Sequence, residues 1–247
     1  MQLSKPQDAI HRQQIYLLLI EIADDPFLAQ NLIFKGGTCA ALLGRLDRFS
    51  VDIDFDLLPG AEQKEVDNHF KKIFKTLDLT IKDESQRVLQ YHLKYKTPPW
   101  KPLTRQILKL DAVNIAYKND HFSPHFLADI DRYLLCHDIE TMFAHKLIAL
   151  LNRYDKKKSI AARDLYDIHH FFMAGYSYNS EIILERTGDT HLEYLKKVIN
   201  FIRSKVTQRN IDQNLNFLLD PVTFKKLRKI LKLETISLIK DEINRQI

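Results

Sequence analysis

The sequence contains few cysteines and no long hydrophobic run. Only Cys39 and Cys136 occur among 247 residues, and they lack the paired spacing of a zinc site. Two cysteines also exclude a disulfide framework and suit a reducing compartment. No stretch approaches the ~20 apolar residues of a membrane span. The apolar Ile15–Ile22 stretch contains Glu21 and lacks the features of a signal peptide. We therefore expect a cytoplasmic protein that has no membrane partner.

Apolar residues are plentiful, whereas charge is unevenly distributed. Hydrophobic residues make up 45% of the chain, which is enough for the core of one large domain or two modest ones. From His191 onward there are 12 Lys and Arg against 6 Asp and Glu, a net charge of +6, so the preceding 190 residues carry −1 of the total +5. A basic C-terminal region suits an anionic partner such as nucleic acid. A solvated face of basic helices is the simpler explanation of the charge alone.

The pattern along the chain changes near residue 135. Before it, helices are predicted over about residues 1–25, Cys39–Leu46 and Glu62–Leu77, and strands over Leu32–Lys35, Val51–Leu57, Leu79–Lys82, Val88–Tyr95 and Arg105–Ile115. Pro98–Pro102, which includes Trp100, predicts a loop. After it, helical patterns dominate, beginning with a helix from His137 or Asp138 to about Tyr154. The fold class is therefore α+β, with a mixed β-sheet and flanking helices in residues 1–135 and a helical domain in residues 136–247.

Three aspartates alternate with apolar residues in one predicted strand. Because side chains alternate between the two faces of a strand, Asp52, Asp54 and Asp56 share one face. Neighbouring carboxylates are costly near a core unless a cation neutralises them, and a divalent metal such as Mg²⁺ or Mn²⁺ does so most simply. On a later predicted strand Lys109 and Asp111 share a face, so Asp111 is a candidate third ligand beside Asp52 and Asp54. Asp56, at the end of its strand, is expected to face solvent.

A double glycine precedes the aspartates by about one helix length. Gly36-Gly37 lies between a predicted strand and a predicted helix, where backbone N–H groups can approach an anion. The helix returns the chain, so Asp52 and Asp54 are expected near this turn. Phosphates of a nucleoside triphosphate (NTP) would then lie between the amides and the metals. Taken separately, a Gly-Gly is usually only a turn and an Asp-x-Asp usually a solvated strand face. Their order along the chain indicates a binding site.

These motifs resemble a known family signature. Lys35–Thr38 (KGGT) and Arg48–Phe55 (RFSVDIDF) together look like the signature of the DNA polymerase β-like nucleotidyltransferase superfamily. More narrowly they are similar to the AbiEii/AbiGii toxin family, whose pattern includes the Arg-x-Ser before the aspartates. The resemblance implies a nucleotidyltransferase-like fold, a divalent metal, and nucleotide binding by Gly36, Gly37, Thr38, Arg48 and Ser50.

The family resemblance also implies a second group of residues in the helical half. A lysine on a helix, Lys146, is followed by an Arg-Asp-x-x-Asp motif that contains Arg163, Asp164 and Asp167. Asp164 and Asp167 are one helical turn apart and are expected to meet Lys146 across two packed helices. The matching residues of the family are active-site members, which implies triphosphate binding by Lys146 and a catalytic role for Lys146 and Asp164. A structural salt bridge between the helices is the alternative. The resemblance leaves open whether Arg163 and Asp167 have a functional or only a structural role.

The resemblance implies a metal-dependent transfer of a nucleoside monophosphate from an NTP to a hydroxyl group, with release of pyrophosphate. The catalytic candidates are Asp52, Asp54, Asp111, Lys146 and Asp164. The implied acceptor is the 3′ end of a tRNA, and the implied role is that of a toxin in a type IV-like toxin–antitoxin or phage-defence system, restrained by a cognate antitoxin. Transfer to a small molecule or a protein is one alternative. A non-catalytic member that binds RNA or a partner is another.

Overall fold

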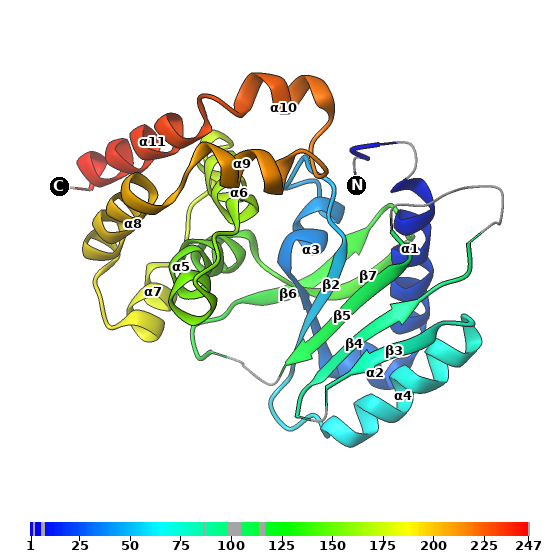
Figure 1. Cartoon of the computed structure of the whole chain (residues 1–247). Coiled ribbons are helices and arrows are strands. Elements are labelled where there is room, and N and C mark those ends of the chain that lie inside the picture. Colours follow the sequence, from blue (N-terminus) through cyan, green and yellow to red (C-terminus); the bar gives the residue numbers. More distant parts are fainter. Residues whose placement is uncertain (2, 6–7, 86, 98–104, 114–116, 247) are drawn as a thin grey trace. The chain divides into compact units, whose positions relative to one another are not determined.

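The computed structural model describes the chain except for residues 2, 6–7, 86, 98–104, 114–116 and 247. The chain forms two compact units, and its course is drawn in Figure 1. Unit 1 comprises residues 1–116 and 122–137, and unit 2 comprises residues 117–121 and 138–247. The loop predicted over Pro98–Pro102, with Trp100, lies outside the described residues.

Unit 1 is built on a mixed sheet, which among the described residues has seven strands. The strands are β1 (Leu32–Lys35), β2 (Asp52–Leu57), β3 (Thr80–Glu84), β4 (Leu89–Lys94), β5 (Ile107–Val113), β6 (Phe122–Leu127) and β7 (Arg132–His137). Their order is β3-β4-β5-β2-β1-β7-β6. The β2–β5 and β1–β7 pairs are parallel, and the other neighbours are antiparallel. The predicted mixed sheet is confirmed.

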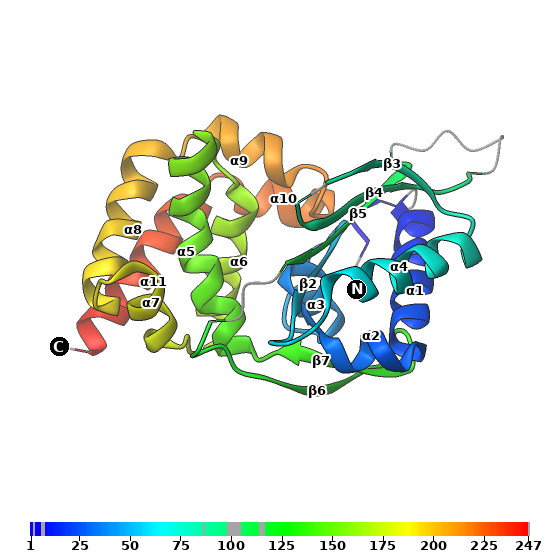
Figure 2. The same ribbon diagram turned by 90° about the horizontal axis from the view of Figure 1, so that it is seen from below.

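One face of this sheet is apolar and covered by helices. The helices of unit 1 are α1 (Ala9–Asp24), α2 (Pro26–Asn31), α3 (Gly36–Leu42) and α4 (Gln63–Thr76). Phe70 and Phe74 of α4 meet the ring of Tyr91 on β4 edge to face, at centroid distances of 6.0 and 5.0 Å. Tyr91 is in register with Leu110, and Leu110 with Ile53, so all three side chains share the covered face. Figure 2 shows α1, α2 and α4 side by side.

Unit 2 is helical. Its helices are α5 (Ile139–Lys157), α6 (Ala162–Met173), α7 (Ser180–Thr187), α8 (His191–Lys205), α9 (Gln208–Leu215), α10 (Pro221–Leu227) and α11 (Leu231–Arg245). Helix α5 contacts α6, α7 and α8, and α11 contacts α6 and α8. Phe143 of α5 and Phe171 of α6 are both buried, with ring centroids 5.2 Å apart. The N-terminus of α8 is closed by a capping box between Thr190 and Glu193.

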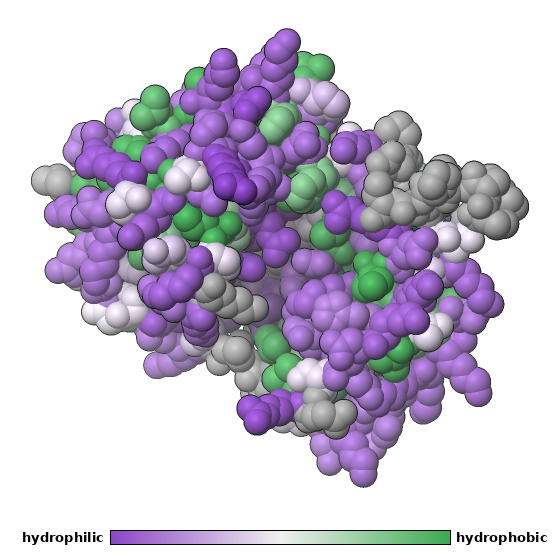
Figure 3. All heavy atoms as spheres, viewed as in Figure 1, coloured by the Kyte–Doolittle hydropathy of each residue, from purple (hydrophilic) through white to green (hydrophobic). Residues whose placement is uncertain are grey.

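Hydrophilic residues dominate the face of the molecule drawn in Figure 3, with apolar residues scattered among them. Across the part of the chain that the structure describes, no helix is both long enough and apolar enough to span a membrane.

Several details differ from the sequence-based predictions. The helix predicted over about residues 1–25 begins at Ala9, and α2 is absent from the predictions. The helix predicted over Cys39–Leu46 runs from Gly36 to Leu42, because Gly44 at φ +68° provides a left-handed turn that ends it. Strands β6 and β7 are absent from the predictions, since Pro124 interrupts the pattern of β6. Proline is tolerated there because β6 is an edge strand of the sheet.

The packing of α4 on the sheet predicts a large stability difference between two phenylalanines. Phe70 is fully buried, so Phe70→Ala should lower the free energy of unfolding by about 3–5 kcal/mol. Phe126 on β6 is 48% exposed, and Phe126→Ala should change it by less than about 1 kcal/mol. Urea unfolding followed by circular dichroism measures both. Equal losses for the two variants would contradict the packing described above.

Candidate active site

The Gly36-Gly37 turn touches the carboxylate of Asp54. Lys35 ends β1 and Gly36 begins α3 directly, with φ at +79°, a conformation that favours glycine. A Cβ atom on Gly36 would lie 2.5 Å from Oδ2 of Asp54, so the carboxylate occupies the space that any other side chain would need. The expectation that Asp54 comes near the glycine turn is confirmed.

The Arg-x-Ser motif supports the second glycine. A Cβ on Gly37 would lie 2.8 Å from Nη2 of Arg48 and 3.0 Å from Oγ of Ser50. Both side chains are buried, and Nη1 of Arg48 donates to the carbonyl of Phe49 at 2.9 Å. The hydroxyl of Thr38 donates to the backbone carbonyl of Asp52. The two motifs of the signature, separate in sequence, are therefore one packed structure.

The sheet register places the carboxylates beside one another. Asp54 on β2 is the Cα partner of Asp111 on β5, and Asp52 is the partner of Lys109. Residues paired in this way present their side chains to the same face, opposite the apolar face covered by α4. Lys109 and Asp111 form an ion pair. Oδ1 of Asp111 is buried and accepts no hydrogen bond from any residue that the structure describes.

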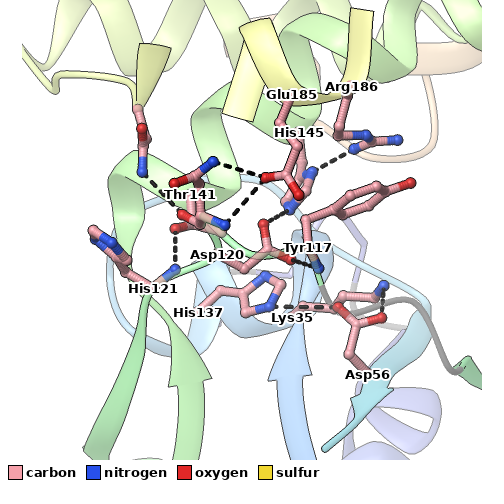
Figure 4. A network of polar contacts seen from close by, with 12 residues as sticks. Lys35, Asp56, Tyr117, Asp120, His121, His137, Thr141, His145, Glu185 and Arg186 are labelled. Atoms are coloured by element: carbon pink, nitrogen blue, oxygen red, sulfur yellow. Dashed lines mark hydrogen bonds and ion pairs between the residues drawn. The ribbon is translucent and has the colours of Figure 1, made fainter. Parts of the chain in front are cut away.

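The prediction that Asp56 faces solvent is wrong. Its side chain is 2% exposed, and it forms an ion pair with Lys35 on β1. Nε2 of His137, at the end of β7, lies 3.4 Å from its other oxygen. Figure 4 shows Lys35 and His137 meeting the carboxylate of Asp56. The cause is contact with residues from other strands, since Lys35 of β1 and His137 of β7 lie against the carboxylate.

In unit 2, Lys146 meets both aspartates of the Arg-Asp-x-x-Asp motif, as the sequence predicts. Its Nζ lies 2.9 Å from Asp164 and 2.9 Å from Asp167, whose side chains are fully buried. Nε of Arg153 also lies 2.9 Å from Asp164. Burial acts to raise the pKa of Asp164, but Lys146 and Arg153 outweigh it and leave the pKa below its ordinary value. Asp164 therefore stays ionised, and Lys146 is held by two negative charges. Arg163 of the same motif is partly exposed.

The sequence does not predict a polar network around His145, the residue that precedes Lys146. Within unit 2, Nε2 of His145 lies 2.8 Å from Asp120, and its Nδ1 contacts Arg186 of α7 (Figure 4). Glu185 accepts hydrogen bonds from the backbone N–H groups of Lys118 and Asn119, at 2.9 and 3.1 Å. These contacts tie residues 117–121 to α5 and α7. They depend on residues 25 to 67 positions apart, which no local pattern links.

Comparisons with known proteins agree with this geometry. The family described as "Nucleotidyl transferase AbiEii toxin, Type IV TA system" matches residues 17–234. The crystal structure of JHP933 from Helicobacter pylori has 21% sequence identity and a TM-score of 0.55, over 99% of this chain and 96% of that one. A crystal structure described as a candidate nucleotidyltransferase from H. pylori has 21% identity and a TM-score of 0.57, over 98% and 99%.

The two structural likenesses show the nucleotidyltransferase fold. No curated protein matches the sequence. The family match covers most of the chain and includes both groups of residues described above. The chain belongs to the AbiEii family of nucleotidyltransferase toxins, and its enzymatic activity is that of a nucleotidyltransferase.

Proposed function

We propose that this enzyme transfers a nucleoside monophosphate from an NTP to the 3′ end of a tRNA, in a metal-dependent reaction. The observation that carries the proposal is the packing of the Asp54 carboxylate on the glycine turn, with Asp111 beside it on the next strand. A phosphate-binding turn and a row of carboxylates are the two parts that a nucleotidyl transfer needs, one for the triphosphate and one for its counter-ions.

The carboxylate row suits a divalent metal. Hard cations such as Mg²⁺ and Mn²⁺ take oxygen ligands, and Asp52, Asp54 and Asp111 supply carboxylate oxygens from one face of the sheet. The buried Oδ1 of Asp111, which no described residue satisfies, supports this use, because a buried carboxylate oxygen is costly without a partner. A metal held there would neutralise charge on the triphosphate and on the leaving group.

The turn would bind the phosphates. We assign that contact to Gly36, Gly37 and Thr38, whose backbone can approach an anion closely because the first two lack side chains. Arg48 and Ser50 act with them by holding Gly37 in place, a role that their burial supports. The attacking hydroxyl forms a bond to the α-phosphorus, the bond between that phosphorus and the bridging oxygen breaks, and pyrophosphate leaves. The hydroxyl proton passes to a carboxylate of the row or to water.

Lys146 and Asp164 are proposed to take part in the same reaction. A lysine is a mobile point charge, and binding it to two buried carboxylates fixes it in one position. A fixed ammonium group is suited to a triphosphate, and Asp164 is the residue that orients it. In this proposal residues 1–135 form the catalytic core. Residues 136–247 contribute Lys146 and an RNA-binding surface.

The proposed RNA surface is on α10 and the residues after it. None of the residues of α10 is buried, and Lys225, Lys226 and Lys229 are exposed. Val222 and Ile230, 63% and 42% exposed, lie among them. Exposed lysines that neutralise phosphates suit an RNA acceptor better than a small molecule.

The family match supports a proposal for the biological role. Its description names a Type IV toxin–antitoxin system, which supports a cognate antitoxin as the protein partner. We propose that the enzyme acts in the cytoplasm, as a toxin that contributes to phage defence.

The transfer itself is tested with purified protein, Mg²⁺, total tRNA and each α-labelled NTP in turn. Label should enter tRNA with the wild type, and chelation of the metal should abolish it. Asp54→Asn should lower the rate by about a hundredfold or more, because charge in the transition state loses its counter-ion site. The matched control Asp83→Asn changes a 77% exposed aspartate on β3 and should leave the rate unchanged. Label in the protein or a small molecule would overturn the tRNA assignment, and no transfer at all would overturn the proposed function.

The RNA surface is tested by charge reversal. Changing Lys225, Lys226 and Lys229 to Glu should raise KM for tRNA by about tenfold or more and reduce its salt dependence, while KM for the NTP stays constant. The control reverses three exposed lysines on α4, namely Lys64, Lys72 and Lys75, with the same change in net charge. If both triple variants weaken tRNA binding equally, general charge rather than α10 is responsible.

A further inference from the structure

We propose that Lys35 is a further phosphate-binding residue of this enzyme and that Asp56 is its positioning residue. The inference rests on the proposed function, since it assigns a third kind of contact to the same nucleotide. It adds two residues whose roles the motifs alone leave unassigned.

Lys35 lies at the meeting point of the turn and the carboxylate row. It is the last residue of β1, directly before Gly36, and it is the Cα partner of Asp54 on β2. Partners across neighbouring strands present their side chains to the same face. Lys35 therefore places a positive charge on the face that carries Asp54 and Asp111, next to the glycines proposed to bind phosphate.

Asp56 fixes the position of that charge. A lysine side chain is flexible and has many rotamers, so its ammonium group contributes little at a site unless something restrains it. The Asp56 carboxylate, 2% exposed, makes an ion pair with Lys35 through Oδ1. Its Oδ2 lies 3.4 Å from Nε2 of His137, which is itself 1% exposed. Because Lys35 of β1 and His137 of β7 each contact one oxygen of Asp56, the carboxylate is restrained, and Lys35 is held with it.

The ion pair leaves Lys35 able to bind a ligand. An ammonium group has three donors, so one carboxylate oxygen does not exhaust it. The Lys35 side chain remains 26% exposed, whereas that of Asp56 is almost completely covered. A cation that is anchored on its buried side and open on the other has the arrangement expected of a group that binds an anion from solvent.

A purely structural ion pair is the competing explanation, and the sequence offers a matched control for it. Lys71 of α4 pairs with Asp67 at 3.1 Å, away from the turn, and is also partly exposed. A structural pair contributes to stability at either place. Only Lys35 should contribute to nucleotide affinity.

The test measures binding and catalysis separately. The probes for binding are inorganic tripolyphosphate and each Mg²⁺–NTP, followed by calorimetry, and steady-state transfer to tRNA gives KM and kcat. Lys35→Met should weaken binding of both probes by about tenfold or more and raise KM for the NTP, with KM for tRNA unchanged. Lys35→Arg should restore part of the affinity, because it keeps the charge. Asp56→Asn should raise KM for the NTP more than it lowers kcat, since Lys35 remains but is no longer fixed.

Folding is controlled with one further variant. Removal of Lys35 alone leaves Asp56 buried and charged, whereas the double variant Lys35→Met/Asp56→Asn removes both charges and should remain folded. It should still bind tripolyphosphate weakly, and Lys71→Met should bind it like the wild type. If the double variant folds and binds the probes with wild-type affinity, the pair is structural and the inference is wrong. If the wild type transfers nothing but Lys35→Met still weakens binding of tripolyphosphate and nucleotide, the proposed function fails while the assignment of Lys35 stands.

Discussion

The contact between the Asp54 carboxylate and the backbone of Gly36 is the constraint on which the rest of the site depends. It exists only because Gly36 lacks a Cβ and accepts φ at +79°. Antiparallel pairing of β1 with β2 brings Asp54 to this point, and parallel pairing of β2 with β5 sets Asp111 beside it. The apolar residues on the other face of β2 and β5, among them Ile53 and Leu110, are fully buried, so the register cannot slip without exposing the core. The same strand register is therefore required for the stability of the sheet and for the geometry of the site.

Both units immobilise a lysine in the same way. Lys35 is paired with the buried Asp56 in unit 1, and Lys146 is paired with the buried Asp164 and Asp167 in unit 2. Burying a carboxylate costs desolvation free energy, and the attraction to its lysine partner does little more than offset that cost. Stability alone is therefore a weak reason for a protein to contain such a pair. The ion pairs do, however, restrict the flexible lysine side chain to one position. A reaction on a triphosphate, whose charge is spread over several oxygens, benefits from cations that are fixed before the substrate arrives.

The sequence predicts the parts of the site that obey local periodicity. Alternation in β2 and β5, the Gly-Gly break after β1 and the one-turn spacing of Asp164 and Asp167 all correspond to the structure. The sequence does not predict the burial of Asp56, because that burial comes from Lys35 of β1 and His137 of β7, which approach β2 only after folding. The Asp120–His145 contact in unit 2 is hidden for the same reason, since it joins positions 25 residues apart. The local periodicity of a sequence carries no information about burial by segments that are distant along the chain.

We propose that the row formed by Asp52, Asp54 and Asp111 is a metal-binding site, and the proposed reaction depends on it. Mn²⁺ binding, followed by the loss of its free-ion electron paramagnetic resonance signal as protein is added, tests it directly. We expect that the wild type binds Mn²⁺, and that Asp54→Asn and Asp111→Asn each weaken binding while their unfolding transitions remain cooperative. Unchanged Mn²⁺ affinity in both variants would contradict it and would leave the row with a structural role.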